Sequence, residues 1–258
     1  MKLQKYLSQA GICSRRKGEE YIERGLVFVN DIVAHIGQVI DPEVDKVRIG
    51  DEIVKEQSEL VYYVYNKPRD IVTTCLSGQE GEKGIMDVID IPERVFPVGR
   101  LDKETTGLIL LTNDGRLSNY LIHPRYEHEK EYMVEVYGKI EDEALEQMSR
   151  GVKIELKENG SRTRKVNRNT ETESPMKLYK TRPCEIERLS SSKFTIILRE
   201  GKNRQIRRMV EVIGSDIKKL KRIRIENIHL GDLKEGEYRR MTETERIGVL
   251  KRMGPEEK

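Results

Sequence analysis

The chain has 258 residues and a formal net charge of +3, and charged and hydrophobic residues each make up 36% of it. Apolar runs recur along the sequence, which excludes disorder throughout and predicts one large domain or two smaller ones. The three cysteines are far apart and the four histidines lack ligand spacing. This excludes a disulfide framework and a zinc site, and it indicates a reducing, cytoplasmic setting. No window approaches about 18 apolar residues, and the N-terminus has no apolar signal segment, so no membrane span is expected.

Basic residues gather in two places although the net charge is small. Between Arg199 and Arg224 ten lysines and arginines stand against three acidic residues. The beginning of the chain supplies a second group, which comprises Lys2, Lys5, Arg15, Arg16, Lys17 and Arg24. Either group alone is more simply a solvated helix face. Two separated basic patches on a near-neutral chain indicate a polyanionic partner that touches both.

The first 55 residues predict two short helices followed by short strands. Apolar residues at helical spacing mark a helix over 3–10 and a second one after Ser14, a residue type that caps helix N-termini. Short strands are expected at 26–29, 32–33, 47–49 and 53–54, with a further one at Val39, and the turns lie at 30–31 and 50–51.

This order of elements resembles the S4 RNA-binding domain over residues 1–55. The segments that carry the resemblance are Leu3-Gln4-Lys5-Tyr6-Leu7, Gly11-Ile12-Cys13-Ser14-Arg15-Arg16, Gly25-Leu26-Val27-Phe28-Val29-Asn30 and Val47-Arg48-Ile49-Gly50-Asp51. The resemblance implies that the second helix lies against folded RNA. Arg15, Arg16 and Lys17 at its start suit phosphate, because a helix N-terminus and an arginine fork both favour anions. Residues 56–60 are polar and aperiodic and are interpreted as a linker.

A second domain is predicted over residues 61–242. Its strands are expected at 61–65, 71–74, 108–111, 131–137, 193–198 and 218–224. Helices are expected between Gly115 and Pro124, around 144–148, and from 204 to the closing Gly214. The polar segment 158–182 predicts a long exposed loop or an irregular hairpin. A C-terminal helix over 243–253 and a frayed tail complete the chain to residue 258.

One stretch of this second domain has the composition of a functional loop. Asp102 lies between Arg100 and Lys103, and Gly99 and Gly107 enclose all three. Glycines permit backbone conformations that side chains forbid, and loops held by rigid elements often carry chemistry. A lone aspartate between glycines is more often a turn residue. The loop alone therefore names a candidate and no more.

Four segments, taken in order, identify the chain as similar to the RsuA family of pseudouridine synthases. They are Tyr65-Asn66-Lys67-Pro68, Gly99-Arg100-Leu101-Asp102 through Gly107-Leu108, Glu129-Lys130-Glu131-Tyr132, and Gly201-Lys202-Asn203-Arg204-Gln205-Ile206-Arg207-Arg208-Met209. The resemblance implies an α+β chain, with a small S4 domain followed by a catalytic domain whose mixed, largely antiparallel sheet is flanked by helices. It also implies that uracil is detached from C1′ of a uridine in RNA, turned and rejoined through C5. No metal and no organic cofactor are expected.

The resemblance also implies roles for individual residues. Asp102 is expected to be the catalytic carboxylate, either as a nucleophile toward C1′ or as a base toward the 2′ carbon. Arg207 is expected to be its counter-charge, with Arg204 as the alternative. Tyr132 would stack on the detached uracil or assist proton removal at C5, and Leu198 would pack against the base.

The remaining basic residues are expected to hold the RNA. Arg100 would enter the gap left by the flipped base, because a base inside folded RNA must leave its stack before C1′ and C5 can be reached. Lys202 and Arg208 extend the binding surface beside the catalytic loop, as Arg15 and Arg16 do in the first domain.

The sequence leaves the RNA target and two other functions open. Large-subunit (23S) rRNA is favoured over small-subunit (16S) rRNA because 122–124 and 129–132 look closer to that branch. A second hypothesis is a non-catalytic, S4-bearing assembly factor, and the joint presence of Asp102, Tyr132 and Arg207 argues against it. A DNA-binding regulator is weaker still, because no dimerisation stripe is present. A monomer is expected.

Overall fold

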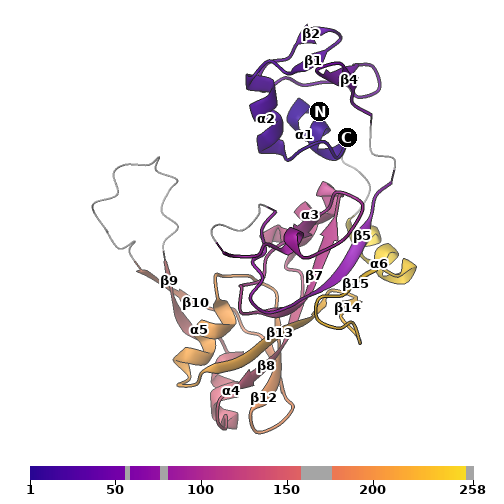
Figure 1. The fold of residues 1–258 in the computed structure, drawn as a ribbon. Coiled ribbons are helices and arrows are strands. Elements are labelled where there is room, and N and C mark those ends of the chain that lie inside the picture. The colour runs from indigo at the N-terminus through magenta and orange to yellow at the C-terminus, as the bar shows by residue number, and fades with distance from the viewer. Residues whose placement is uncertain (56–58, 76–80, 158–175, 254–258) are drawn as a thin grey trace.

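The computed structural model describes residues 1–55, 59–75, 81–157 and 176–253. The chain builds a small N-terminal unit of two helices and a short sheet, followed by a large sheet with helices packed on it (Figure 1). The larger part is the predicted mixed, largely antiparallel sheet flanked by helices, so the predicted fold class is confirmed. The expected linker falls partly on residues 56–58, and the expected tail on 254–258, which lie outside the described residues.

The N-terminal unit folds as its hydrophobic spacing predicts. Helices α1 (Leu3–Gln9) and α2 (Arg15–Glu23) pack against strands in the order β2-β1-β3-β4. These strands are β1 (Val27–Val29), β2 (Ile32–Val33), β3 (Val47–Ile49) and β4 (Glu52–Ile53). Ser14 caps α2 by accepting a hydrogen bond from the Lys17 amide at 3.2 Å, which satisfies a free N–H of the first turn. The prediction of a strand at Val39 is wrong, because this residue forms only an isolated bridge to Lys2.

The large sheet runs in the order β11-β12-β8-β13-β7-β5-β15. Its strands are β5 (Tyr62–Lys67), β7 (Thr106–Thr112), β8 (Lys130–Val136), β11 (Glu185–Arg188), β12 (Lys193–Leu198), β13 (Ile217–Ile225) and β15 (Tyr238–Arg240). Two short strands lie off this path: β6 (Phe96–Val98) pairs with β7, and β14 (Ile228–His229) pairs with β13. Only the β7–β13 pairing is parallel among the pairings of this sheet in the described residues.

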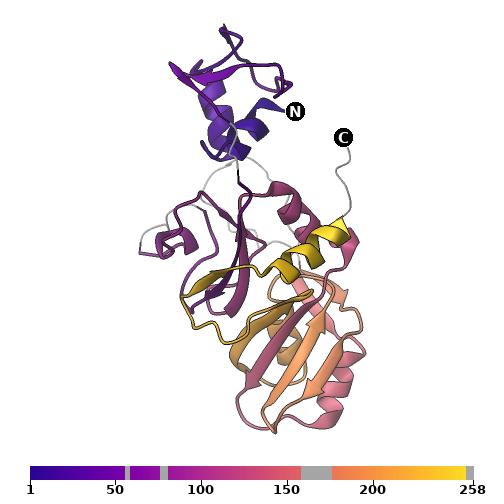
Figure 2. The same cartoon turned by 90° about the vertical axis from the view of Figure 1, so that its right-hand side faces the viewer.

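Helices cover the sheet in two groups. Helices α4 (Asp142–Ser149) and α5 (Gln205–Val212) bury their apolar sides against β8, β12 and β13. Helices α3 (Gly115–Ile122) and α6 (Glu243–Met253, yellow in Figure 2) contact each other and cover β5 and β7. Short 3-10 turns occupy η1 (Ile85–Asp87) and η2 (Pro124–Tyr126). Since β5 and β7 are buried on both faces, they read in the sequence as nearly continuous apolar runs.

The structure corrects one predicted segment and decides between two alternatives for another. Residues 71–74 form no strand apart from an isolated Val72–Gly84 bridge, because the Thr74 amide donates to the Val72 carbonyl at 2.9 Å and turns the chain there. In the segment 158–182, residues 158–175 lie outside the described residues. Of the two alternatives for this segment, the hairpin agrees with Met176–Lys180, which forms strand β10 and pairs antiparallel with β9 (Lys153–Lys157).

Gly107 allows the central parallel pairing. Its φ is +103°, and a Cβ at this position would lie 2.3 Å from the Arg222 carbonyl oxygen. A side chain would therefore push β7 and β13 apart. The pairing matters for the site, because it holds the loop before β7 beside the face of β13 that carries Arg222.

Candidate active site

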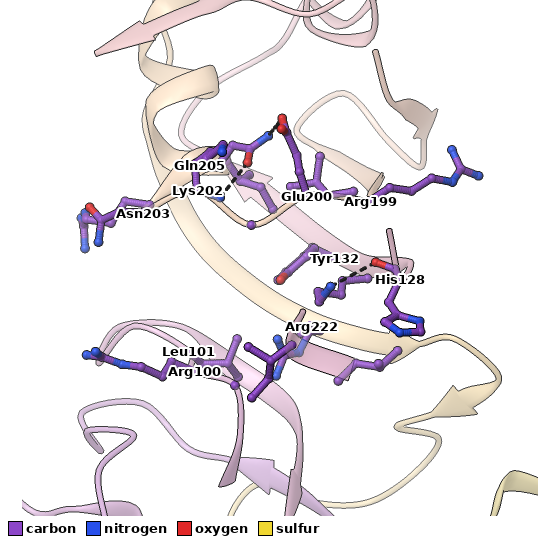
Figure 3. Close-up of a pocket in the computed structure, with 18 of the residues that line it drawn as sticks. Arg100, Leu101, His128, Tyr132, Arg199, Glu200, Lys202, Asn203, Gln205 and Arg222 are labelled. Carbon is purple, nitrogen blue, oxygen red and sulfur yellow. Dashed lines mark hydrogen bonds between the residues drawn. The ribbon is translucent and has the colours of Figure 1, made fainter. Parts of the chain in front are cut away.

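A cleft of about 560 Å³ opens over one face of the large sheet, between the loop before β7 and the segment that leads into α5 (Figure 3). Its floor is formed by β8, β12 and β13, from which Lys130, Tyr132, Leu198 and Arg222 face the cavity. The Gly99–Asp102 loop lies along one side, and the 199–207 segment lies along the other. Parts of the chain that are far apart in sequence thus meet around one space.

The Asp102 loop is fixed by short hydrogen bonds on both sides of the aspartate. The Thr73 hydroxyl donates to the Leu101 carbonyl at 2.9 Å and accepts from the Leu101 amide at 3.2 Å. The Thr105 amide donates to the Asp102 carbonyl at 3.0 Å and closes a turn. The main chain is therefore rigid at the residue that presents its carboxylate to the cleft.

Lys67 anchors the same loop from below. Its side chain is fully buried, and its ammonium donates to the carbonyls of Pro68 at 2.8 Å, Ile71 at 2.7 Å and Lys103 at 3.3 Å. Burial lowers the pKa of Lys67 to about 8, although the nearby carboxylates of Asp70 and Asp102 act in the opposite direction. The sequence contained this lysine within a family motif, but its anchoring role became visible only through the carbonyls around it.

Two arginines face the Asp102 carboxylate at the same distance. Arg204 Nη1 and Arg207 Nε each lie 3.9 Å from Asp102 Oδ2. Both also pair with Glu104, at 3.4 Å from its Oε2. The side chain of Arg204 is 42% exposed and that of Arg207 is 16% exposed. The structure therefore brings both predicted counter-charges to Asp102, and they differ in burial.

Arg207 is a partly dehydrated cation. Burial lowers its pKa, whereas the neighbouring carboxylates of Glu104 and Asp102 act to raise it. Its Nη2 donates to the Thr105 hydroxyl at 3.4 Å, and its buried Nε has no hydrogen-bond partner. Because neither arginine is within hydrogen-bonding distance of Asp102, the Asp102 carboxylate is held near positive charge with its oxygens available to a substrate.

Tyr132 and Leu198 lie on the floor of the cleft, as predicted for residues that contact a base. Tyr132 is the β-partner of Ile196 and of Arg222. Leu198 is the partner of Lys130 and is 4% exposed. A tyrosine ring beside apolar side chains forms a surface suited to a flat heterocycle.

The other predicted RNA-binding residues take three different positions. Arg100 is exposed and lies at the edge of the cleft, and Lys202 lines it with its ammonium 4.7 Å from the Tyr179 ring centre. Arg208 does not line the cleft; it donates to the carbonyls of Asn203 and Glu155, and so links α5 to β9. Arg15, Arg16 and Lys17 are exposed at the start of α2 in the N-terminal unit.

Lys130, Arg222 and His128 line the cleft but were not singled out from the sequence. The spacing of Lys130 and Tyr132 carried a usable signal, since residues two apart on a strand face the same side. Arg222 lay in a run of alternating basic residues, and nothing local distinguished the one that becomes buried. His128 is enclosed by the rings of Tyr120 and Tyr126.

Two features, a metal-binding cluster and a membrane-spanning helix, are absent from the described residues. In that part of the chain, no group of three or more histidine, cysteine, aspartate or glutamate side chains is arranged to hold a metal ion. No helix in the same residues is both long and apolar enough to cross a membrane.

Comparison with known proteins assigns both parts of the chain. Residues 61–212 match the family described as RNA pseudouridylate synthase, and residues 1–53 match the S4 domain. The chain is 39% identical to the dual-specificity RNA pseudouridine synthase RluF of Escherichia coli K12, covering 97% of this chain and 79% of that protein. It is 35% identical to the ribosomal large subunit pseudouridine synthase B of Bacillus subtilis, covering 96% of each. A crystal structure of a pseudouridylate synthase aligns over 96% of this chain and 99% of its own, with a TM-score of 0.63 and 25% identity.

Proposed function

Since the chain belongs to the RNA pseudouridylate synthase family and carries an S4 RNA-binding domain, we propose that it isomerises one specific uridine of ribosomal RNA, with Asp102 as the catalytic carboxylate. Enzymes of this kind are isomerases that act on RNA. The observation that carries the proposal is the meeting of Asp102, Arg204 and Arg207 at the cleft. The S4 domain corresponds to residues 1–55, a linker to 56–60, the catalytic domain to 61–242, and a C-terminal helix and tail to 243–258.

The reaction makes physical demands that the cleft fits. The target base must leave its stack, because C1′ and C5 are not reachable inside folded RNA. Arg100, at the exposed edge, takes the space left by the base, and the base lies against Tyr132 and Leu198. Asp102 then acts either on C1′ as a nucleophile or on the 2′ hydrogen as a base, and one ionised carboxylate suits both.

The RNA contacts divide between the two parts of the chain. Arg15, Arg16 and Lys17 bind phosphates of the folded RNA from α2, and Lys202 binds those next to the target uridine. Arg208 adds its charge to the same side of α5, although it also fixes β9. Such contacts release counterions, so binding weakens as the salt concentration rises.

Large-subunit rRNA is the proposed target. The name of the Bacillus subtilis relative, ribosomal large subunit pseudouridine synthase B, supports this choice over small-subunit rRNA. The protein acts in the cytoplasm as a monomer without metal or cofactor. Three free cysteines agree with a reducing compartment.

Release of tritium tests the isomerase chemistry. Pseudouridine formation replaces the C5 hydrogen, so rRNA labelled with tritium at C5 of uridine releases label into water as the reaction proceeds. Wild-type protein is expected to release label, and Asp102→Asn to release it at least about 1,000-fold more slowly while binding rRNA equally well. Equal release by both proteins would overturn the assignment of Asp102. Failure of the wild type on all rRNA would favour the non-catalytic assembly factor.

The target is identified by mapping pseudouridines in rRNA from cells with and without the gene. A pseudouridine of the large subunit that disappears without the gene is the expected result. Loss of a small-subunit pseudouridine instead would assign the enzyme to that RNA and refute the large-subunit proposal.

A further inference from the structure

Two cations in the floor of the cleft have no role in the arrangement around Asp102. Arg222 is 3% exposed, and Figure 3 shows it between Tyr132 and Leu101. Its Nε donates to the Leu108 carbonyl at 2.7 Å, and its buried Nη2 has no hydrogen-bond partner. Lys130 lies two residues before Tyr132 on β8, and its ammonium donates to the His128 carbonyl at 3.0 Å.

No carboxylate neutralises either cation within the described part of the chain. Neither Lys130 nor Arg222 has a carboxylate oxygen within the 4.0 Å of an ion pair there. Glu226 is the nearest source of negative charge for Lys130, and it is engaged by the His128 ring, the Glu129 amide and Arg252.

The acidic residues of the cleft are also engaged elsewhere. Asp102 faces the α5 arginines, and Glu127 pairs with Arg182. Glu200 accepts from Tyr179, Gln205 and the Arg182 amide. The two cations of the floor are thus a local excess of positive charge in a dehydrated place.

This excess is costly for the empty protein. Burial, and after it the charge of Arg222, lowers the pKa of Lys130 to about 8. A buried donor without a partner adds a further penalty, since its hydration is lost and not replaced. Both costs fall when a group with negative charge or carbonyl oxygens enters the cleft.

The surroundings of the two cations favour a heterocycle over a phosphate. Leu198, Leu220 and Ile225 are 4%, 6% and 3% exposed, and with Tyr132 they supply apolar surface around Lys130 and Arg222. A phosphate would lose its hydration against these side chains. A flat base with polar carbonyl edges matches the combination of apolar walls and a few buried donors.

We propose that Lys130 and Arg222 stabilise the negative charge that uracil acquires when it separates from the ribose. This inference rests on the proposed function. When the C1′–N1 bond breaks, its electron pair remains on N1, and the charge spreads to the O2 and O4 carbonyl oxygens. Until then C1′ is either bonded to the Asp102 carboxylate or, where Asp102 has taken the 2′ proton, joined to the 2′ carbon by a double bond. The C5–C1′ bond forms as that ester bond breaks or as Asp102 returns the 2′ proton. The C5 hydrogen then leaves as a proton to water, and N1 takes a proton from water. Atoms and charge balance, and the base is anionic only between these events.

The proposal assigns the sugar and the base of the target uridine to different residues. Asp102 and its arginines act at the sugar, whereas Lys130 and Arg222 act at the base. Donors aimed at charge that develops during a reaction give larger stabilisation in a water-poor site than in water. Asp102 and its arginines belong to the two sides of the cleft, and Lys130 and Arg222 belong to its floor, so each set can be changed while the other is kept.

The test uses full-length protein, at pH 7, with an rRNA fragment that spans the mapped target uridine. Lys130→Met and Arg222→Met, which remove the charge, are expected to lower the single-turnover rate about 100-fold with unchanged RNA affinity, as for the loss of one oxyanion donor. Lys130→Arg, which keeps the charge, is expected to recover most of the rate. The control is Lys219→Met, an exposed position on β13 outside the cleft, which is expected to match the wild type.

A second substrate separates charge stabilisation from simple misplacement of the base. 5-Fluorouracil is a weaker base than uracil, because fluorine withdraws electron density, so its anion needs less help. The deficits of Lys130→Met and Arg222→Met are therefore expected to be smaller on fragments that carry 5-fluorouridine, with breakage of the C1′–N1 bond measured after nuclease digestion.

The outcomes are distinct. Wild-type rates in both variants would overturn the inference, and so would equal deficits on uridine and fluorouridine. Thermal unfolding of each variant shows whether a lower rate reflects loss of the fold. If a neutral variant is unfolded, the charge-keeping Lys130→Arg variant takes its place, and its rates on the uridine and 5-fluorouridine fragments are compared. Absence of turnover by the wild type would instead contradict the proposed function.

Discussion

The basic side chains of the N-terminal unit and those of the cleft differ in their contact with water. Arg15 and Arg16 are exposed at the start of α2, whereas Arg207 is 16% exposed and Arg222 is 3% exposed. An exposed cation has little effect on the free energy of folding, and its attraction for an anion is screened by salt. A buried cation is costly, and its field reaches nearby reacting groups almost unscreened. In the function proposed above, burial, more than the number of charges, separates the residues assigned to RNA binding from those assigned to chemistry.

The largest effect is expected where an exposed and a buried arginine face the same carboxylate. Arg207→Met is expected to lower the single-turnover rate at saturating RNA about 100-fold, because a poorly hydrated counter-charge is lost. Arg204→Met is expected to lower it only about tenfold, because its side chain is 42% exposed and water replaces part of its charge. Rapid-quench measurement of tritium release compares the two. Equal losses would show that burial does not distinguish them.

A smaller effect is expected from the exposed arginines of α2. The double substitution Arg15→Ala and Arg16→Ala is expected to weaken rRNA binding about tenfold and to reduce the slope of log affinity against log salt by about 2, since two phosphate contacts are lost. The rate at saturating RNA should stay unchanged. Filter binding over a salt series measures both quantities. Lys46→Ala, at an exposed position just before β3 and outside the basic group of the two helices, is the control, and a wild-type slope in the double variant would contradict the prediction.

The smallest effect concerns the pH dependence of stability. Burial lowers the pKa of Lys67 from 10.5 to about 8. Between these values the unfolded chain binds more protons at this position than the folded chain, so the contribution of Lys67 to the free energy of unfolding rises with pH. The rise is expected to be about 1 kcal/mol from pH 8 to pH 9.5 and to be missing in Lys67→Met. Urea denaturation at both pH values tests this, and parallel behaviour of the two proteins would refute it.

Local patterns predicted most of the elements and the residues of the Asp102 loop. The helices α2, α3 and α5 and the strands β7, β8 and β12 follow apolar spacing that depends on near neighbours alone. The prediction was wrong at 71–74, where the Thr74 amide donates to the Val72 carbonyl and the chain turns. At 176–180 the sequence left a loop and a hairpin open, and the antiparallel pairing with β9 favours the hairpin.

The sequence by itself determined the family and the order of the two domains, since motifs and apolar spacing are local properties of the chain. Only the tertiary structure decided that both Arg204 and Arg207 face Asp102. It alone decided, too, that Arg222 is the buried member of a basic strand. These outcomes depend on the strand order β8-β13-β7, which joins segments about one hundred residues apart. Burial and charge pairing are set by such non-local contacts, and no spacing within one segment encodes them.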